Sequence, residues 1–221
     1  MKNMKRLIAA ACALTLALSL CACGGSGSAS SGKTPASSTP SGTTSTPAGT
    51  ASTPAASSTP AATTKSFGDP VVIISVGMSA DITLAENIAK KVGLNYSVYN
   101  AETTDLSKAA SVIIVPGVST KGLGAAGISL DDEIKATKGI LDKLSDSTSV
   151  LVLHLGGSSR RDELTDQLID VVLPAADHIM ALADANKDNK FSDFATKNNV
   201  PSNIAAALPN IVTDLSALFG K

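Results

Sequence analysis

The segment SVLVLHLGG (149–157) decides the fold that we predict for this chain. Its apolar run is too short for an ordinary helix and ends in two glycines, which is typical of a strand buried on both faces. A helical pattern follows this run and each of four others, so strands and helices alternate. The sequence therefore predicts an α/β fold with a five-stranded parallel sheet between two helical layers. The other four strand segments are PVVIISV (70–76), the weaker NYSVYN (95–100), SVIIVPG (111–117) and HIMALAD (178–184).

The order of these strands is expected to be 2-1-3-4-5, as in flavodoxin-like sheets with right-handed crossovers. The alternative is 3-2-1-4-5, the order of dinucleotide-binding domains. A glycine fingerprint for a dinucleotide does not follow the first strand. The segment GLGAAG (122–127) has the right spacing, but it follows the third strand and is expected to open no helix there.

Helix boundaries can also be predicted. A helix is expected over 80–92 with Gly93 as its stop, and Ser129 with Asp132 forms a capping box for a second helix. After the fourth strand, Ser159 is the expected N-cap and Asp162 the third helical residue. This puts two arginines in the first turn, against the positive end of the helix dipole. Two helical stretches are expected to close the chain.

The first 22 residues are typical of an export signal, with a basic start and a short apolar core, LIAAACALTLALSL (7–20). The following LCAC (20–23) resembles the lipobox of bacterial lipoproteins. The resemblance implies cleavage before Cys23, acylation of Cys23 and a lipid-anchored protein facing outside the cytoplasm. Cys21 is a weaker cleavage site, because Leu20 would occupy a position that needs a small residue. The remaining alternative is an ordinary secretory signal.

Residues 23–66 are predicted to be a disordered tether. They consist almost entirely of Gly, Ser, Thr, Ala and Pro, without an apolar face to bury. Residues 67–221 form one domain with 13 basic and 19 acidic side chains. This net charge of −6 and the scarcity of aromatic residues exclude a nucleic-acid-binding domain. All three cysteines lie at or before residue 23, so the domain has no disulfide and no thiolate chemistry.

Four segments of the domain, taken in order, resemble an uncharacterised bacterial domain family of exported proteins. They are VGMSAD (76–81), GVSTKGLGAAGISLDDE (117–133), HLGGSSRRDEL (154–164) and DANKDN (184–189). The resemblance covers nearly all of 68–221. It supports the predicted fold and implies no particular activity.

The predicted loops at the carboxyl edge of the sheet collect the unusual residues, and ligands of such sheets bind at this edge. Glycines would allow a ligand to approach the backbone, and arginines offer forked donors for a carboxylate or phosphate. The alternative is that both arginines pair with Asp162, Glu163 or Asp166 on a solvated surface. The candidate ligand-binding residues are Ser79, Asp81, Ser119, Lys121, His154, Gly156, Gly157, Ser158, Arg160 and Arg161.

Two of these loops carry further candidates. His154 can be a general base or, as we favour, a hydrogen-bonded core residue. Asp184, Asn186 and Asp188 fit the first, third and fifth positions of a calcium loop, whereas Ala195 replaces the bidentate acid of the twelfth. The alternative is a polar connecting loop. Calcium is therefore the single cofactor candidate, and no cofactor is otherwise expected.

Three functions remain open from the sequence. The first is a lipid-anchored module that binds a small anionic ligand at the loop edge. The second is a hydrolase-type enzyme that uses the same loops with His154 or Asp81 as its base, although the sequence contains no convincing catalytic triad. The third is a protein-interaction or structural domain of the cell envelope, with a partner that the sequence does not identify.

Overall fold

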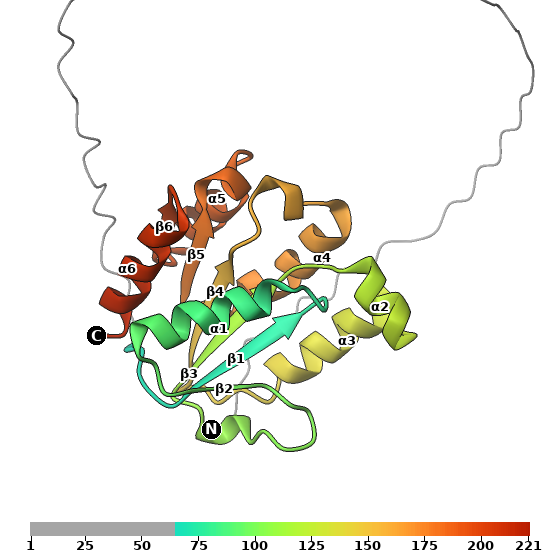
Figure 1. Ribbon diagram of the computed structural model, residues 1–221, viewed down its shortest axis with the longest axis horizontal. Coiled ribbons are helices and arrows are strands. Elements are labelled where there is room, and N and C mark those ends of the chain that lie inside the picture. Colours follow the sequence, from blue (N-terminus) through green and yellow to red (C-terminus); the bar gives the residue numbers. More distant parts are fainter. Residues whose placement is uncertain (1–64) are drawn as a thin grey trace, which may run out of the picture. The chain divides into compact units, whose positions relative to one another are not determined.

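The computed structural model describes residues 65–221, which form a six-stranded sheet with helices around it (Figure 1). All neighbouring strands are paired in parallel, which confirms the predicted α/β class. The three central strands have every residue buried or nearly so, as expected where helices cover both faces of a sheet. The strands are β1 (Val71–Val76), β2 (Tyr96–Val98), β3 (Ser111–Pro116), β4 (Ser149–His154), β5 (His178–Leu182) and β6 (Ser202–Ala205).

The strand order is β2-β1-β3-β4-β5-β6. The flavodoxin-like order is thus confirmed for the first five strands, and the alternative order 3-2-1-4-5 is wrong. The order reverses between β1 and β3, and this is the position where sheets of this type bind ligands beyond the strand ends. The amino ends are aligned across the centre, because Val71 pairs with Ser111 and Ser111 pairs with Ser149.

The expected count of five strands is wrong, because β6 adds a sixth at the edge beyond β5. Its residues SNIA follow a helix and show no continuous apolar run, so the sequence carries no strand signal there. Backbone pairing with β5 makes this segment a strand, since Ile179 to Leu182 pair with Ser202 to Ala205 in register.

The helices form two layers, and Figure 1 shows α1 crossing in front of the sheet and α4 behind it. Helices α1 and α6 pack on one face, and α3, α4 and α5 pack on the other. The predicted stop of α1 is confirmed, because Gly93 has a left-handed φ of 81°, and the Ser129–Asp132 capping box is also present. The helices are α1 (Asp81–Val92), α2 (Thr120–Ala126), α3 (Leu130–Leu141), α4 (Glu163–Val172), α5 (Lys190–Asn198) and α6 (Leu208–Leu218).

Two boundaries differ from the prediction. The glycine-rich segment after β3 forms α2, because the Ser119 side chain caps its start by accepting from the Gly122 amide. Helix α4 begins at Glu163, and its N-cap is Asp162 rather than Ser159. A short 3-10 helix, η2 (Ser158–Arg160), takes up the residues before it. The two arginines therefore precede α4, so the conflict with the helix dipole that the sequence suggested does not arise.

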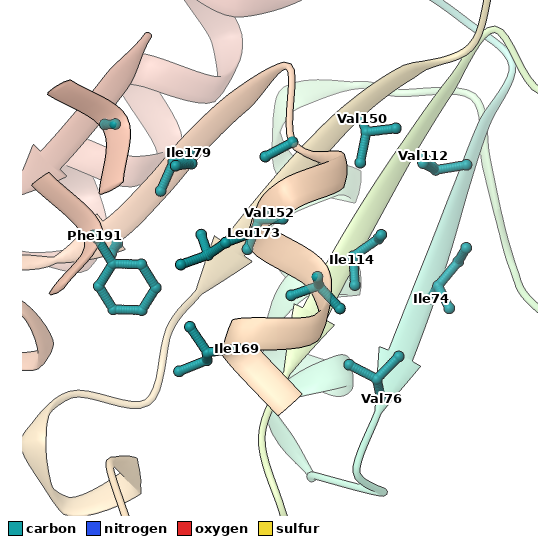
Figure 2. Packing of buried hydrophobic residues seen from close by; sticks show 14 of the residues in the cluster. Ile74, Val76, Val112, Ile114, Val150, Val152, Ile169, Leu173, Ile179 and Phe191 are labelled. Carbon is teal, nitrogen blue, oxygen red and sulfur yellow. The ribbon is translucent and has the colours of Figure 1, made fainter. Parts of the chain in front are cut away.

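Each face of the sheet has its own hydrophobic core. Figure 2 shows the core beneath α4, where Ile169 and Leu173 lie between the sheet residues and Phe191 of α5. Full burial of one such large apolar side chain contributes about 1.5–3 kcal/mol. Because α4 begins directly after the loop that follows β4, this core also fixes the position of that loop.

The first described residues run along the amino edge of the sheet. The Lys65 ammonium lies 3.1 Å from a carboxylate oxygen of Asp177 and donates to the Thr148 carbonyl. The hydroxyl of Ser149, the first residue of β4, donates to the Ser66 carbonyl at 2.8 Å. The chain therefore enters the domain at the edge opposite to the candidate site.

The predicted signal peptide, the lipidation of Cys23 and nearly all of the predicted tether lie outside the described residues. Within 65–221, every helix falls short of the length and hydrophobicity that crossing a bilayer requires.

Candidate functional site at the carboxyl edge of the sheet

The loops after β1 and β3 are bound to each other and to the helices behind them. Met78 forms an antiparallel bridge with Val118, and the Ser119 amide donates to the Gly77 carbonyl at 2.8 Å. The Gly77 amide in turn donates to the Glu133 carboxylate of α3 at 2.7 Å. These contacts join the β1 and β3 loops to each other and to α3 at the switch point.

Asp81 is the first residue of α1 and lies at this switch point. Its carboxylate packs against the loops after β3 and β4. A methyl group on Gly117 would lie 3.5 Å from Asp81 Oδ2, and one on Gly156 would lie 3.0 Å from the same atom. Asp81 Oδ2 is buried, and no residue in 65–221 donates a hydrogen bond to it. Three predicted site residues, Asp81, Gly156 and Ser79, are therefore brought together, since Ser79 also contacts Gly117.

Arg160 belongs to the same group. Its Cβ and Cγ pack on Gly156 so closely that a methyl group there would clash with both. The side chain is exposed, and within 65–221 no carboxylate lies within ion-pair distance of its guanidinium. The stem of Arg160 and Oδ2 of Asp81 therefore contact the same glycine, and no ion pair joins the two side chains. We refer to Ser79, Asp81, Gly117, Gly156 and Arg160 as the Asp81 group.

Arg161 points to a different set of residues. Its Nε and Nη2 donate to the two carboxylate oxygens of Asp166, and Nη2 also lies 2.7 Å from Asp188. Nη1 donates to the Ala185 carbonyl, and only 9% of the side chain is exposed. The carboxylate of Asp166 is the main cause that raises the pKa of Arg161 above its usual value. This geometry is the structural pairing with Asp166 that the sequence left open as the alternative.

The loop after β5 completes this second set. Asp184 accepts from both the amide and the hydroxyl of Ser158, each at 2.6 Å, and pairs with Lys187. The bonds from Lys187 and Ser158 lower the pKa of Asp184. Gly157 has a φ of 61° and turns its backbone toward Asp184. A shallow hollow of about 280 Å³ lies here. We call its polar and charged lining residues the Arg161 group: Ser158, Arg161, Asp166, Asp184, Lys187 and Asp188.

The residues of the predicted calcium loop have separate partners. Asp184 binds Ser158, and Asp188 binds Arg161. The Asn186 side chain accepts from the amides of Phe191 and Ser192 and thereby holds the start of α5. Across residues 65–221, no three His, Cys, Asp or Glu side chains are grouped so that they could hold a metal ion.

His154 is the last residue of β4 and is completely buried. Its Nδ1 lies 3.1 Å from the Pro116 carbonyl oxygen, which can only accept, so Nδ1 carries the proton. Burial lowers the pKa of His154, and the ring is therefore neutral at neutral pH. Its Nε2 has no hydrogen-bond partner within the described part of the chain. The ring stacks on Phe191 at 5.5 Å, and the Arg161 guanidinium lies 5.3 Å from the same Phe191 ring.

The predicted site is thus two adjacent groups rather than one. Ser119 serves as the cap of α2, and Lys121 is exposed in the first turn of that helix. Sequence reasoning missed Glu133 and Met78 at this edge. Met78 is 41% exposed and has a positive φ of 59°, which is rare for a residue with a side chain. No pattern in the sequence indicates either feature, because both depend on contacts between distant segments.

Together, the sheet order and the converging loops define a doubly wound α/β domain with its candidate site at the switch point. The chain belongs to a family described as a domain of unknown function, DUF6305, whose model matches residues 68–219. This membership confirms the resemblance to an uncharacterised domain family and specifies no activity. No curated protein and no solved structure matches the chain.

Proposed function

We propose that this protein is a lipid-anchored domain that binds a small anion outside the cytoplasm, with Arg160 as the main contact. The observation that carries the proposal is the placement of Arg160 on Gly156, in the loop after β4 and next to the switch point, without an acidic partner in 65–221. A guanidinium in this position keeps its donors available for a carboxylate or phosphate.

The neighbouring arginine supports the proposal by contrast. Arg161 lies in the same loop, yet its donors are taken by Asp166, Asp188 and the Ala185 carbonyl. Arg161 therefore stabilises the loop itself, whereas Arg160 remains available at the exposed edge of the sheet. Lys121 is the second cation at this edge that has no ion pair within residues 65–221, and it would add attraction at longer range.

The anchor is the second part of the proposal. Acylation of Cys23 would attach the protein to the membrane, and residues 23–64 would act as a flexible tether of about 35–40 Å. Because Lys65 is held at the amino edge, the tether would join the domain on the side away from Arg160. The anion site would then face away from the membrane surface. Metabolic labelling with a radioactive fatty acid tests this part: label on the wild type and none on Cys23→Ser is expected, whereas equal labelling contradicts it.

Binding is tested by thermal-shift measurements on the full chain in detergent, with phosphate, acetate and a sugar phosphate as probes. A ligand at a hundred times its dissociation constant stabilises by about 2.7 kcal/mol, or roughly 5–11 °C for a domain of this size. We expect Arg160→Ala to abolish the shift and the matched control Lys197→Ala to retain it. An equal shift in wild type and Arg160→Ala overturns the assignment. Calcium belongs in the same series, because Asp184 and Asp188 line the hollow of the Arg161 group.

The anion-binding proposal is better supported than the hydrolase alternative. Completely buried, His154 presents no surface to a substrate, and its Nδ1 is held by the Pro116 carbonyl. Neither observation favours a general base. The envelope-interaction alternative predicts instead that a co-purifying protein partner is retained by Arg160→Ala.

A further inference from the structure

Two buried hydrogen-bond acceptors at the carboxyl edge have no donor within residues 65–221. They are Oδ2 of Asp81 and Nε2 of His154. Buried polar atoms are almost always paired, because an unpaired one costs about 1–3 kcal/mol. Ser75 and Thr137 also have unpaired buried oxygens, but those are hydroxyl groups that can donate as well as accept. Asp81 and the neutral His154 offer only lone pairs at these atoms.

The surroundings of Asp81 provide no donor. Gly117 and Gly156, against which the carboxylate packs, have no side chains. The hydroxyl of Ser79 accepts from the Asp81 amide at 3.2 Å and donates no hydrogen bond to Oδ2 of the carboxylate. The guanidinium of Arg160 is not within ion-pair distance, although its stem contacts the same glycine.

The Asp81 group therefore combines a carboxylate and an arginine that form no ion pair with each other. The carboxylate of Asp81 and the stem of Arg160 both contact Gly156, so a small molecule held by the Arg160 guanidinium at this edge would lie near the carboxylate. A simple anion would satisfy Arg160 and would be repelled by Asp81. A molecule that carries a donor next to its anionic group would satisfy both at once.

We infer that the ligand is a small anion with an adjacent hydroxyl or ammonium group, and that Asp81 accepts the hydrogen bond from that group. This inference rests on the proposed anion site at Arg160. Hydroxy acids, amino acids and phosphates with a neighbouring amine share the chemistry. His154 Nε2 lies at the end of β4, two residues before Gly156 in the sequence, and because the ring is completely buried the ligand does not contact it directly.

The test uses pairs of probes that differ in the donor alone. Dissociation constants of acetate, glycolate and glycine, and of ethyl phosphate and phosphoethanolamine, are measured by NMR titration of the full chain in detergent. We expect at least one donor-bearing probe to bind about ten times more tightly than its plain partner. In Asp81→Ala this ratio should fall to about one, while the plain anion binds as well as before or better. The matched control Asp146→Ala removes an acid at the opposite edge and should keep the ratio.

The outcomes separate this inference from the proposed function. If plain and donor-bearing probes bind equally in the wild type, the anion site stands and the role of Asp81 is overturned. If no anion binds, both are overturned. A ratio that persists in Asp81→Ala also overturns the inference. Asp81→Asn, which nearly preserves the shape, serves where Asp81→Ala fails to fold, and with the ammonium probes it should likewise reduce the ratio because the negative charge is lost.

Discussion

Arg161 binds both carboxylate oxygens of Asp166, with Nε 2.5 Å from Oδ1 and Nη2 3.0 Å from Oδ2. This bidentate pair joins the loop after β4 to the body of α4, and Asp188 extends it to the loop after β5. Arg160, one residue earlier, has no such partner in the described chain. Adjacent residues of identical chemistry therefore have different roles, which single substitutions can separate.

Arg161→Ala is expected to destabilise the fold by about 2 kcal/mol, because it leaves Asp166 and the Ala185 carbonyl without their charged donor. Arg160→Ala is the matched control and should change the free energy of unfolding by less than about 0.5 kcal/mol. Urea denaturation followed by circular dichroism measures both. Equal losses in the two variants would contradict the division of roles.

The pairing of Arg161 with Asp188 should also affect how the stability of the fold depends on pH in the acid range. The Arg161 hydrogen bond lowers the pKa of Asp188 in the folded protein. The stabilisation is therefore present above the unfolded pKa of about 4 and is lost as the pH falls through the lower folded pKa. Asp188→Asn should reduce the Tm at pH 7 and flatten its fall between about pH 5 and 2. Asp146→Asn, which removes an exposed acid without a described partner, should leave the profile parallel to that of the wild type.

His154 is predicted to stay neutral when exposed histidines become charged. Its burial lowers the folded pKa, so the unfolded chain takes up the proton first and stability decreases as the pH falls below about 6.5. Nitrogen NMR of the imidazole at pH 6 should show a neutral ring with the proton on Nδ1. A ring that is half protonated at pH 6.5, or one protonated on Nε2, would contradict the contact with the Pro116 carbonyl.

Two glycine-to-alanine substitutions should change the stability of the fold in opposite directions. Gly77→Ala would force a methyl group against the Gly117 carbonyl in a backbone with φ of 92°, and should cost about 2 kcal/mol or more. Gly139→Ala places its methyl group on α3, where no atom lies within 4 Å, and should stabilise by roughly 0.5–1 kcal/mol. Thermal unfolding of both variants is the measurement. A stable Gly77→Ala would show that the β1 loop adapts more easily than the contacts suggest.

Local patterns in the sequence are sufficient to predict most strands of the sheet. Continuous apolar runs predicted β1, β3, β4 and β5, and Gly93 and the Ser129–Asp132 box correctly marked helix ends. These features are encoded within a few residues, by side-chain periodicity and by capping hydrogen bonds. The predicted start of α4 is wrong because Ser159 and Asp162 are both good caps, and the chain uses Asp162, whose side chain accepts from the Thr165 amide.

The sequence by itself therefore determined the class of fold, the order of the first five strands and the edge at which the unusual residues gather. Tertiary structure decided what those residues do there. It added β6 through pairing with β5, used Arg161 for Asp166 and Asp188, and left Arg160 beside Asp81. The physical reason is that strands and caps depend on near neighbours, whereas ion pairs and close backbone contacts depend on where distant loops meet.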